Sequence, residues 1–285
     1  MTARFHADAW YTTGDGHIVG QDYAIAHDGP GPQAIAIVSD GCSSSPDTDV
    51  GARLLARAAL ATGSERHSPC GSAAIWRAAA ASEPLGLPAH ALDATLLVAH
   101  AHDETIEISV RGDGVLAARR RDGTVEIWVV THPQGAPYYP SYTLDPARHR
   151  EYLKVYGDCV KIEHRARDGR WHTESSRGEG RRFTLERAAY DLVLLASDGV
   201  LSFVGPPCSE DTHHHERQRD TDAAPVAVGC IIAGLLGVPR LHGRFLARRA
   251  RRFVGKTCTA RGWRPLDDVG IAAIAITHEG PQAPK

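Results

Sequence analysis

The sequence has no closely spaced cysteine pair, no long hydrophobic run and no large excess of charge of either sign. Its six cysteines are scattered along 285 residues, at Cys42, Cys70, Cys159, Cys208, Cys230 and Cys258. This distribution matches neither the ligand spacing of a zinc knuckle nor the density of a disulfide framework. We therefore expect reduced thiols, as is usual for proteins of the cytosol.

Other absences argue against further classes of protein. The longest apolar run, residues 223–238, is shorter than the roughly 20 residues that a membrane helix needs. The first eight residues lack the apolar core of a secretory signal. A formal net charge of −2 does not favour nucleic acid as a partner. The sequence predicts a cytoplasmic protein with no membrane and no nucleic-acid partner.

Length and composition predict one large domain. A chain of 285 residues with 42% hydrophobic residues can bury a full core. The expected domain spans residues 1–285 and contains a polar insert at about residues 206–222. This insert carries His213-His214-His215 near Cys208, but no second ligand cluster has the spacing of a metal site. We interpret the insert as an exposed polar loop.

Two apolar runs of strand length end in the same three residues, Ser-Asp-Gly. The first run ends at Asp40-Gly41 and the second at Asp198-Gly199. Each predicts a buried strand that ends in a carboxylate, and two such strands can place both carboxylates at one rim of a sheet, where a divalent cation could join them. Asp-Gly is also a favoured hairpin turn, and Asp122-Gly123 and Asp168-Gly169, between arginine-rich flanks, are interpreted as such turns. Asp40 and Asp198 differ because a carboxylate at the edge of a core needs a partner.

Further aspartates stand beside apolar strands. Asp22 enters an alternating strand, where a solvent-facing edge position is the alternative, and Asp267 and Asp268 lead into the final apolar run. Carboxylate, carbonyl and water oxygens suit Mg²⁺ and Mn²⁺, and glycine at Gly41 allows the backbone carbonyl to approach an ion. Two such ions about 3.5–4 Å apart lower the pKa of a bridging water and clamp a phosphoryl group. This pattern indicates a hydrolase.

The remaining pattern predicts strands and helices along the whole chain. Helices are expected at residues 50–60, 72–81, 224–238 and 241–254. Strands are expected on both sides of a turn at residues 14–16, in an antiparallel meander at residues 94–99, 105–111, 114–119 and 124–130, and in a hairpin at residues 167–170. The last helix carries five arginines from Arg244 to Arg252, which we interpret as a solvated face rather than a site for an anionic partner.

Several of these motifs occur in a family order. They are, in sequence, Gly20-Gln21-Asp22, Val38-Ser39-Asp40-Gly41, Val50-Gly51-Ala52-Arg53, Thr95, Gly112-Asp113-Gly114, Leu195-Ala196-Ser197-Asp198-Gly199 and Asp267-Asp268. The series resembles the metal-dependent protein phosphatases of the 2C-like family, particularly its bacterial branch. Each motif is short, but the resemblance runs from about residue 12 to residue 277. Order and spacing make it specific.

The resemblance implies an α+β fold, a four-layer α-β-β-α sandwich of two antiparallel sheets flanked by helices. It implies two Mn²⁺ or Mg²⁺ ions, direct attack on phosphorus by a hydroxide that bridges them, a Ser/Thr-phosphorylated protein as substrate, and a cognate Ser/Thr kinase as partner in signalling. Asp40 would bridge the ions, Gly41 would offer its carbonyl, and Asp198 and Asp267 would hold one ion. Asp22 would orient metal-bound water, and Asp113 with Asp198 would bind a third, weaker ion.

The chain departs from the family pattern at three positions. Asp268 stands where an asparagine is frequent, so Asp267 and Asp268 are both candidate metal ligands, with Asp267 favoured by the strand that follows. His17 stands where many relatives have a phosphate-binding arginine, and it lacks the bidentate fork of that side chain. Cys42 replaces the histidine that eukaryotic relatives offer as a general acid.

These departures keep two alternatives to a protein phosphatase open. One is a catalytically weak phosphatase-like module that binds or regulates a partner. The other is a metallohydrolase of small phosphate esters.

Overall fold

Two antiparallel sheets lie face to face in the computed structural model, which describes residues 3–29, 33–63, 71–206 and 223–278. One sheet has the strand order β1 (Ala3–Thr12), β15 (Val269–His278), β11 (Tyr190–Ala196), β6 (Gly114–Arg120), β7 (Val125–Thr131), β8 (Val160–Arg165) and β9 (Trp171–Ser176). The other has the order β10 (Gly180–Glu186), β5 (Thr105–Arg111), β4 (Leu96–His102), β3 (Gln33–Asp40) and β2 (Asp22–Asp28). Three short strands, β13 (Ala224–Pro225), β12 (Phe203–Gly205) and β14 (Arg264–Pro265), form a small third sheet.

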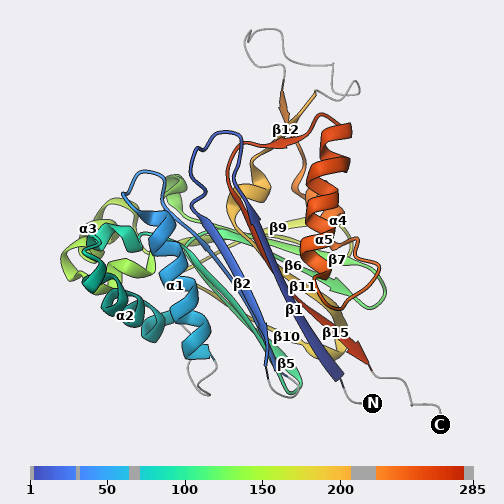
Figure 1. The fold of residues 1–285 in the computed structure, drawn as a ribbon, viewed down its shortest axis with the longest axis horizontal. Coiled ribbons are helices and arrows are strands. Elements are labelled where there is room, and N and C mark those ends of the chain that lie inside the picture. The colour runs from blue at the N-terminus through green and yellow to red at the C-terminus, as the bar shows by residue number, and fades with distance from the viewer. Residues whose placement is uncertain (1–2, 30–32, 64–70, 207–222, 279–285) are drawn as a thin grey trace.

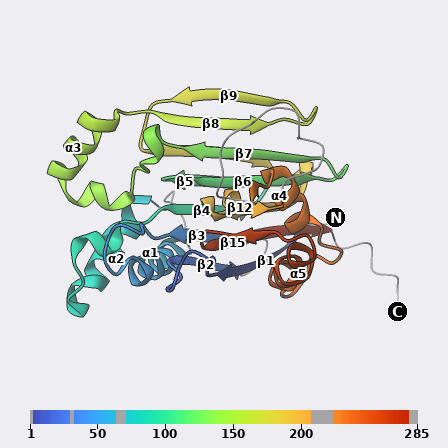
Figure 2. The ribbon, with the colours of Figure 1, turned by 90° about the horizontal axis from the view of Figure 1, so that it is seen from above.

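Helices cover the outer faces of the two large sheets. The helices are α1 (Thr48–Gly63), α2 (Gly71–Ser82), α3 (Pro146–Tyr156), α4 (Val228–Leu236) and α5 (Phe245–Arg252), and a π-helical segment at Phe253–Cys258 continues α5. Figures 1 and 2 show α1 and α2 on one side of the strands and α4 and α5 on the other. The predicted four-layer α-β-β-α sandwich is confirmed.

Alternating side chains explain why the central strands read as continuous apolar runs. In β3, Ala36 and Val38 pack between the two sheets, whereas Ile35 and Ile37 pack against α1 and α2. In β11, Leu195 packs between the sheets and its neighbours pack against α4 and α5. Strands buried on both faces carry no polar alternation, and the sequence therefore marks these two strands clearly.

Most predicted turns and helices are present. The hairpins at Asp122-Gly123 and Asp168-Gly169 are confirmed, with positive φ of 87° at Gly123 and 80° at Gly169. Helix α4 is shorter than predicted because β13 and Pro225 occupy the start of its apolar run. On α5, Arg248, Arg251 and Arg252 are exposed, as expected for a solvated face.

Two predicted strand pairings are wrong. The turn at residues 14–16 does not close a hairpin, because β1 pairs with β15 in one sheet and β2 pairs with β3 in the other. The predicted meander is interrupted at residues 112–114, where the chain crosses from β5 in one sheet to β6 in the other. The crossing has a physical cause in Gly112 and Gly114, whose φ values are 83° and 142°, a backbone that residues with a Cβ rarely adopt. The crossing also places Asp113 between the two sheets instead of in a hairpin of one sheet.

Among the described helices, none combines the length and apolar character needed to cross a bilayer. The His213-His214-His215 motif and nearly all of the expected insert lie outside the described residues. The single-domain boundary of residues 1–285 stays a prediction.

Candidate metal centre

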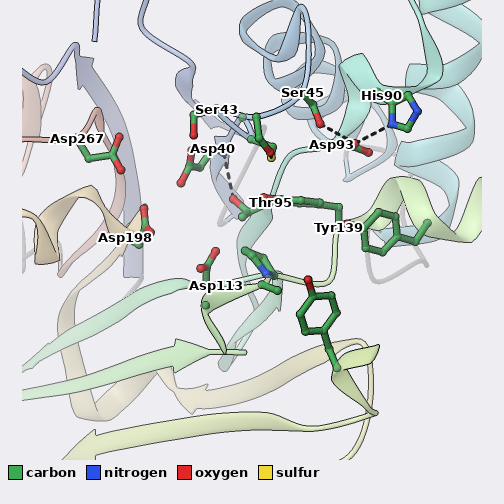
Figure 3. A pocket seen from close by; sticks show the side chains of 18 of the residues that line it. Asp40, Ser43, Ser45, His90, Asp93, Thr95, Asp113, Tyr139, Asp198 and Asp267 are labelled. Atoms are coloured by element: carbon green, nitrogen blue, oxygen red, sulfur yellow. Dashed lines mark hydrogen bonds and ion pairs between the residues drawn. The ribbon is translucent and has the colours of Figure 1, made fainter. Parts of the chain in front are cut away.

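Four aspartates from separate parts of the chain line one pocket where β3, β5 and β11 end. Asp40 ends β3, Asp113 lies between β5 and β6, Asp198 follows β11, and Asp267 precedes β15. Figure 3 shows their side chains around a common opening, and the pocket has a volume of about 570 Å³. Asp40 and Asp198 belong to two facing sheets, and not to one rim as the sequence suggested.

Asp22 lies beside Asp40, because the two residues are direct partners in the β2–β3 ladder. Asp22 is only 2% exposed, so the solvent-facing alternative is wrong. Its Oδ2 accepts a 2.6 Å hydrogen bond from Ser197 Oγ, whereas its buried Oδ1 has no hydrogen-bond partner among the described residues. Burial raises the pKa of Asp22 to about 7, although the Ser197 hydrogen bond and the close approach of the Asp40 carboxyl group oppose the rise.

The neighbouring carboxyl groups are perturbed in the same direction. Removal from water is the largest cause in each, raising the pKa of Asp40 well above its usual range, that of Asp113 to about 7, and that of Asp198. The charges of Asp22 and Asp198 raise the pKa of Asp40 further. In the described part of the chain, no lysine or arginine forms an ion pair with Asp40, Asp113 or Asp198.

This excess of negative charge requires a cation or bound protons for compensation. An all-oxygen donor set is what hard divalent ions such as Mn²⁺ and Mg²⁺ prefer. The unpartnered Oδ1 of Asp22 adds a buried acceptor behind that set. The residues present therefore fit such ions.

Asp267 and Asp268 have different surroundings. The Asp267 side chain is 45% exposed and lines the pocket. Asp268 is 2% exposed, and its two carboxylate oxygens accept backbone N–H groups of Gly14 at 2.8 Å and Gln21 at 2.5 Å. Asp268 thus fastens the residues between β1 and β2, and this contact replaces the hairpin that the sequence suggested.

His17 lies in the same loop and reaches the pocket. Its Nδ1 is 3.2 Å from Asp268 Oδ2 and 3.4 Å from Asp267 Oδ1. One nitrogen of His17 and one carboxylate oxygen from each of the two aspartates lie within 4.8 Å of one another. Partial burial lowers the pKa of His17, but the nearby Asp268 carboxylate and the other surrounding carboxylate charges outweigh it, and the pKa is raised. Backbone N–H groups already bind both Asp268 oxygens. We therefore interpret this cluster as one that holds the His17 side chain in position.

Gly41 and Cys42 follow Asp40 along the pocket. A Cβ on Gly41 would lie 2.8 Å from the carbonyl oxygen and 2.9 Å from the Cβ of Thr48, so close packing against α1 is what requires glycine there. Cys42 Sγ is 3.1 Å from Ser44 Oγ. Burial raises the pKa of the Cys42 thiol, but hydrogen bonds with Ser44 and Tyr139 outweigh it and lower the pKa.

The pocket continues beyond the aspartates to residues that sequence reasoning missed. Asp93, Tyr139, Tyr142 and Arg148 line its other half. The pattern Leu92-Asp93-Ala94 carries no local signal of a site, because its importance comes from contacts with residues about 50 positions away in both directions. For the two tyrosines, the sequence shows only that tyrosine is more frequent after residue 132, and not that these side chains line a pocket.

Two facing antiparallel sheets with a carboxylate-lined pocket at their strand ends form a site suited to a metal-dependent hydrolase. The sequence profile described as "Protein phosphatase 2C" matches residues 14–223, which is more than half of the chain. The chain belongs to this family of metal-dependent protein-serine/threonine phosphatases. The matched region contains Asp22, Asp40, Asp113 and Asp198, and it ends before Asp267.

Solved bacterial structures share the fold over nearly the full chain. The Ser/Thr phosphatase Stp1 from Staphylococcus aureus is 14% identical, with 98% of this chain and 96% of that chain covered and a TM-score of 0.51. PppA, a type VI secretion regulator from Pseudomonas aeruginosa, is 13% identical, with 97% and 99% covered and a TM-score of 0.53. The catalytic domain of the phosphatase PstP, in complex with two manganese ions, is 16% identical, with 97% and 100% covered and a TM-score of 0.50. A search of curated proteins found no match.

Proposed function

We propose that this protein removes phosphate from phosphoserine and phosphothreonine in proteins, using two Mn²⁺ or Mg²⁺ ions. Asp40, Gly41, Asp198 and Asp267 would hold these ions, and Asp113 with Asp198 would hold a third. The observation that carries the proposal is the convergence of carboxylates from four segments on one open pocket, where Asp40, Asp113 and Asp198 have no lysine or arginine partner among the described side chains. The family, and the two manganese ions of the PstP catalytic domain, support it.

The side chains of this chain would take distinct parts in the reaction. Bound ions would supply positive charge that polarises the phosphoryl group and lowers the pKa of a coordinated water. Asp22 offers a buried, unpartnered Oδ1 that can accept a proton or hydrogen bond near neutral pH. His17, whose raised pKa favours the imidazolium form, can donate a hydrogen bond to a phosphate oxygen in the pocket.

Metal-dependent turnover is the direct test. The purified protein should hydrolyse p-nitrophenyl phosphate and a phosphothreonine peptide with Mn²⁺ or Mg²⁺, lose both activities with EDTA, and regain them when the ion is restored. Activity that persists without a divalent ion would contradict the proposed chemistry. Absence of turnover under all conditions would favour a phosphatase-like binding module.

A metallohydrolase of small phosphate esters is less well supported. The pocket extends past the carboxylates to Tyr139, Tyr142 and Arg148, which leaves room for the residues around a phosphorylated side chain. A preference for peptide over small metabolite esters is expected in competition assays.

Asp267→Asn and Asp268→Asn should have different consequences. Removing the pocket-facing carboxylate of Asp267 should weaken Mn²⁺ binding and reduce turnover by a factor of about 10². Asp268→Asn should leave Mn²⁺ affinity nearly unchanged but lower the free energy of unfolding by about 1–3 kcal/mol, because an amide NH₂ would face a backbone N–H. Calorimetric Mn²⁺ titration and urea unfolding of both variants would measure this, and the reverse pattern would make Asp268 the ligand.

A further inference from the structure

Asp93 is a buried carboxylate outside the predicted metal ligands, in the turn before β4. Its side chain is 3% exposed. Oδ2 accepts hydrogen bonds from Ser45 Oγ at 3.0 Å and Arg148 Nη2 at 2.8 Å, and lies 3.3 Å from His90 Nδ1. Oδ1 accepts a 2.6 Å bond from Ser141 Oγ. These four partners come from three separate parts of the chain, and Figure 3 shows two of the contacts.

The backbone around Asp93 runs beside the strand end that carries Asp40. The Asp93 carbonyl accepts a 2.8 Å hydrogen bond from Cys42 N, and Thr95 N donates at 2.8 Å to the Asp40 carbonyl. Thr95 Oγ1 in turn accepts from Asp40 N at 3.1 Å. Together with the Ser45 contact, these bonds attach the floor of the pocket, residues 40–45, to Asp93.

Two other partners of Asp93, Ser141 and Arg148, belong to the wall of the pocket. We call residues 133–156, which connect β7 to β8, the wall segment. Ser141 lies in a 3₁₀ turn of this segment and Arg148 lies in α3. The Arg148 guanidinium lies 4.7 Å from the centre of the Tyr142 ring. The wall segment supplies much of the pocket lining, including Tyr139, Tyr142 and Arg148.

Asp93 is ionised at the place where it connects the floor to the wall segment. Burial alone would raise its pKa, but hydrogen bonds from Arg148 and Ser141 outweigh burial and hold the pKa below its usual range. The Asp93 carboxylate is thus charged, and each of its described side-chain partners is a hydrogen-bond donor from the floor, the wall segment or the adjoining turn. An ion pair buried on one side contributes little net stability once the cost of removing the charges from water is counted.

We propose that Asp93, through its ion pair with Arg148, is a positioning residue that sets the wall segment against the floor for phosphopeptide substrates. The inference rests on the proposed phosphatase function and assigns the wall half of the pocket to the residues that flank the phosphorylated side chain. A small aryl phosphate reaches only the aspartate half. Loss of the pair should therefore affect peptide recognition more than the chemical step.

Three variants, Asp93→Asn, Arg148→Met and the double variant, test this with Mn²⁺ present. Each single variant should raise KM for a phosphothreonine peptide about tenfold, the size of losing one charged hydrogen bond. The kcat on p-nitrophenyl phosphate should stay within about twofold, because the backbone bonds of residues 93–95 to the floor remain. The double variant should be no worse than either single one, since both break the same interaction. Arg148→Lys, which keeps the charge, should restore most of the peptide KM.

Asp191→Asn provides a matched control. Asp191 pairs with Arg119 through bonds of 2.8 and 3.0 Å, and neither residue lines the pocket. Amide hydrogen exchange in the wall segment should rise at least tenfold in Asp93→Asn and Arg148→Met but not in Asp191→Asn. Unchanged exchange, additive effects in the double variant, or equal losses on both substrates would overturn the inference. Amide hydrogen exchange does not depend on turnover. It therefore tests whether the Asp93–Arg148 pair holds the wall segment even if the wild-type protein is inactive and the proposed function is wrong.

Discussion

Asp40→Asn is expected to reduce Mn²⁺-dependent turnover by a factor on the order of 10³, about 4 kcal/mol of transition-state stabilisation. Asp40 lies between Asp22 and Asp198, with both of which its carboxyl group interacts directly. An amide keeps the shape of the side chain but removes the charge and one metal-binding oxygen. The residue that would join two ions is therefore lost, and no other carboxylate of the pocket occupies the same place in the β2–β3 ladder.

The same substitution should have the opposite effect on the stability of the metal-free protein. Burial and the charges of Asp22 and Asp198 raise the pKa of Asp40, so the fold disfavours its ionised form. The wild-type protein loses stability as pH rises from the unfolded-state value toward this raised pKa, because the folded state binds more protons. Asp40→Asn should thus unfold at a higher temperature than wild type at pH 8 in EDTA. The advantage should vanish below about pH 4, where both states are protonated.

Asp168→Asn is the matched control, because it changes the aspartate of an identical Asp-Gly pair in an exposed hairpin. It should alter neither turnover nor the response to Mn²⁺. Initial rates, calorimetric Mn²⁺ titration and thermal melts at the two pH values would be compared for the three proteins. If Asp40→Asn retained a tenth of the activity, or lost its activity only through unfolding, Asp40 would not be the central ligand.

The sequence was most informative where a single strand carried the signal. Asp40 and Asp198 could be found because each follows an apolar run that is buried on both faces, and such a run ending in a carboxylate is unusual. The crossing at Asp113 was placed in the wrong topology, since a glycine-rich connection looks the same within one sheet or between two. The family order, not local pattern, identified that aspartate.

Asp93 shows a different limit. Its partners Ser45 and Arg148 lie 48 and 55 residues away, in segments whose approach depends on the packing of both sheets. No periodicity or turn rule predicts such a joint. The same reason hid the role of Asp268, whose carboxylate accepts backbone groups 254 and 247 residues earlier in the chain. For the adjacent, chemically identical residues Asp267 and Asp268, the following strand favoured Asp267 as the ligand, and the structure adds that Asp268 is buried whereas Asp267 is exposed to the pocket.

Gly199→Ala is expected to cause a large loss of stability, about 3 kcal/mol or more, because the site cannot accept a methyl group. Gly199 is buried, and a Cβ there would lie 1.7 Å from the carbonyl oxygen of Asp268 and 3.3 Å from the Cα of Val269. Both obstacles are backbone atoms at the start of β15, so no side-chain rotation relieves the clash. The start of β15 must move away from Asp198, and Asp267 must move with it.

Because of that movement, the substitution should have two effects that can be measured separately, a loss of stability and a weaker binding of Mn²⁺. Gly199→Ala should weaken Mn²⁺ binding although residue 199 offers no ligand atom, because it spreads Asp198 and Asp267 apart. Gly229→Ala in α4 is the control: no atom of the described residues lies within 4 Å of its Cβ position, and alanine in a helix should be neutral or stabilising by up to about 1 kcal/mol. Urea unfolding and Mn²⁺ titration of both variants would measure the two effects. A Gly199→Ala protein as stable as wild type would show that the two strand ends do not need this close approach.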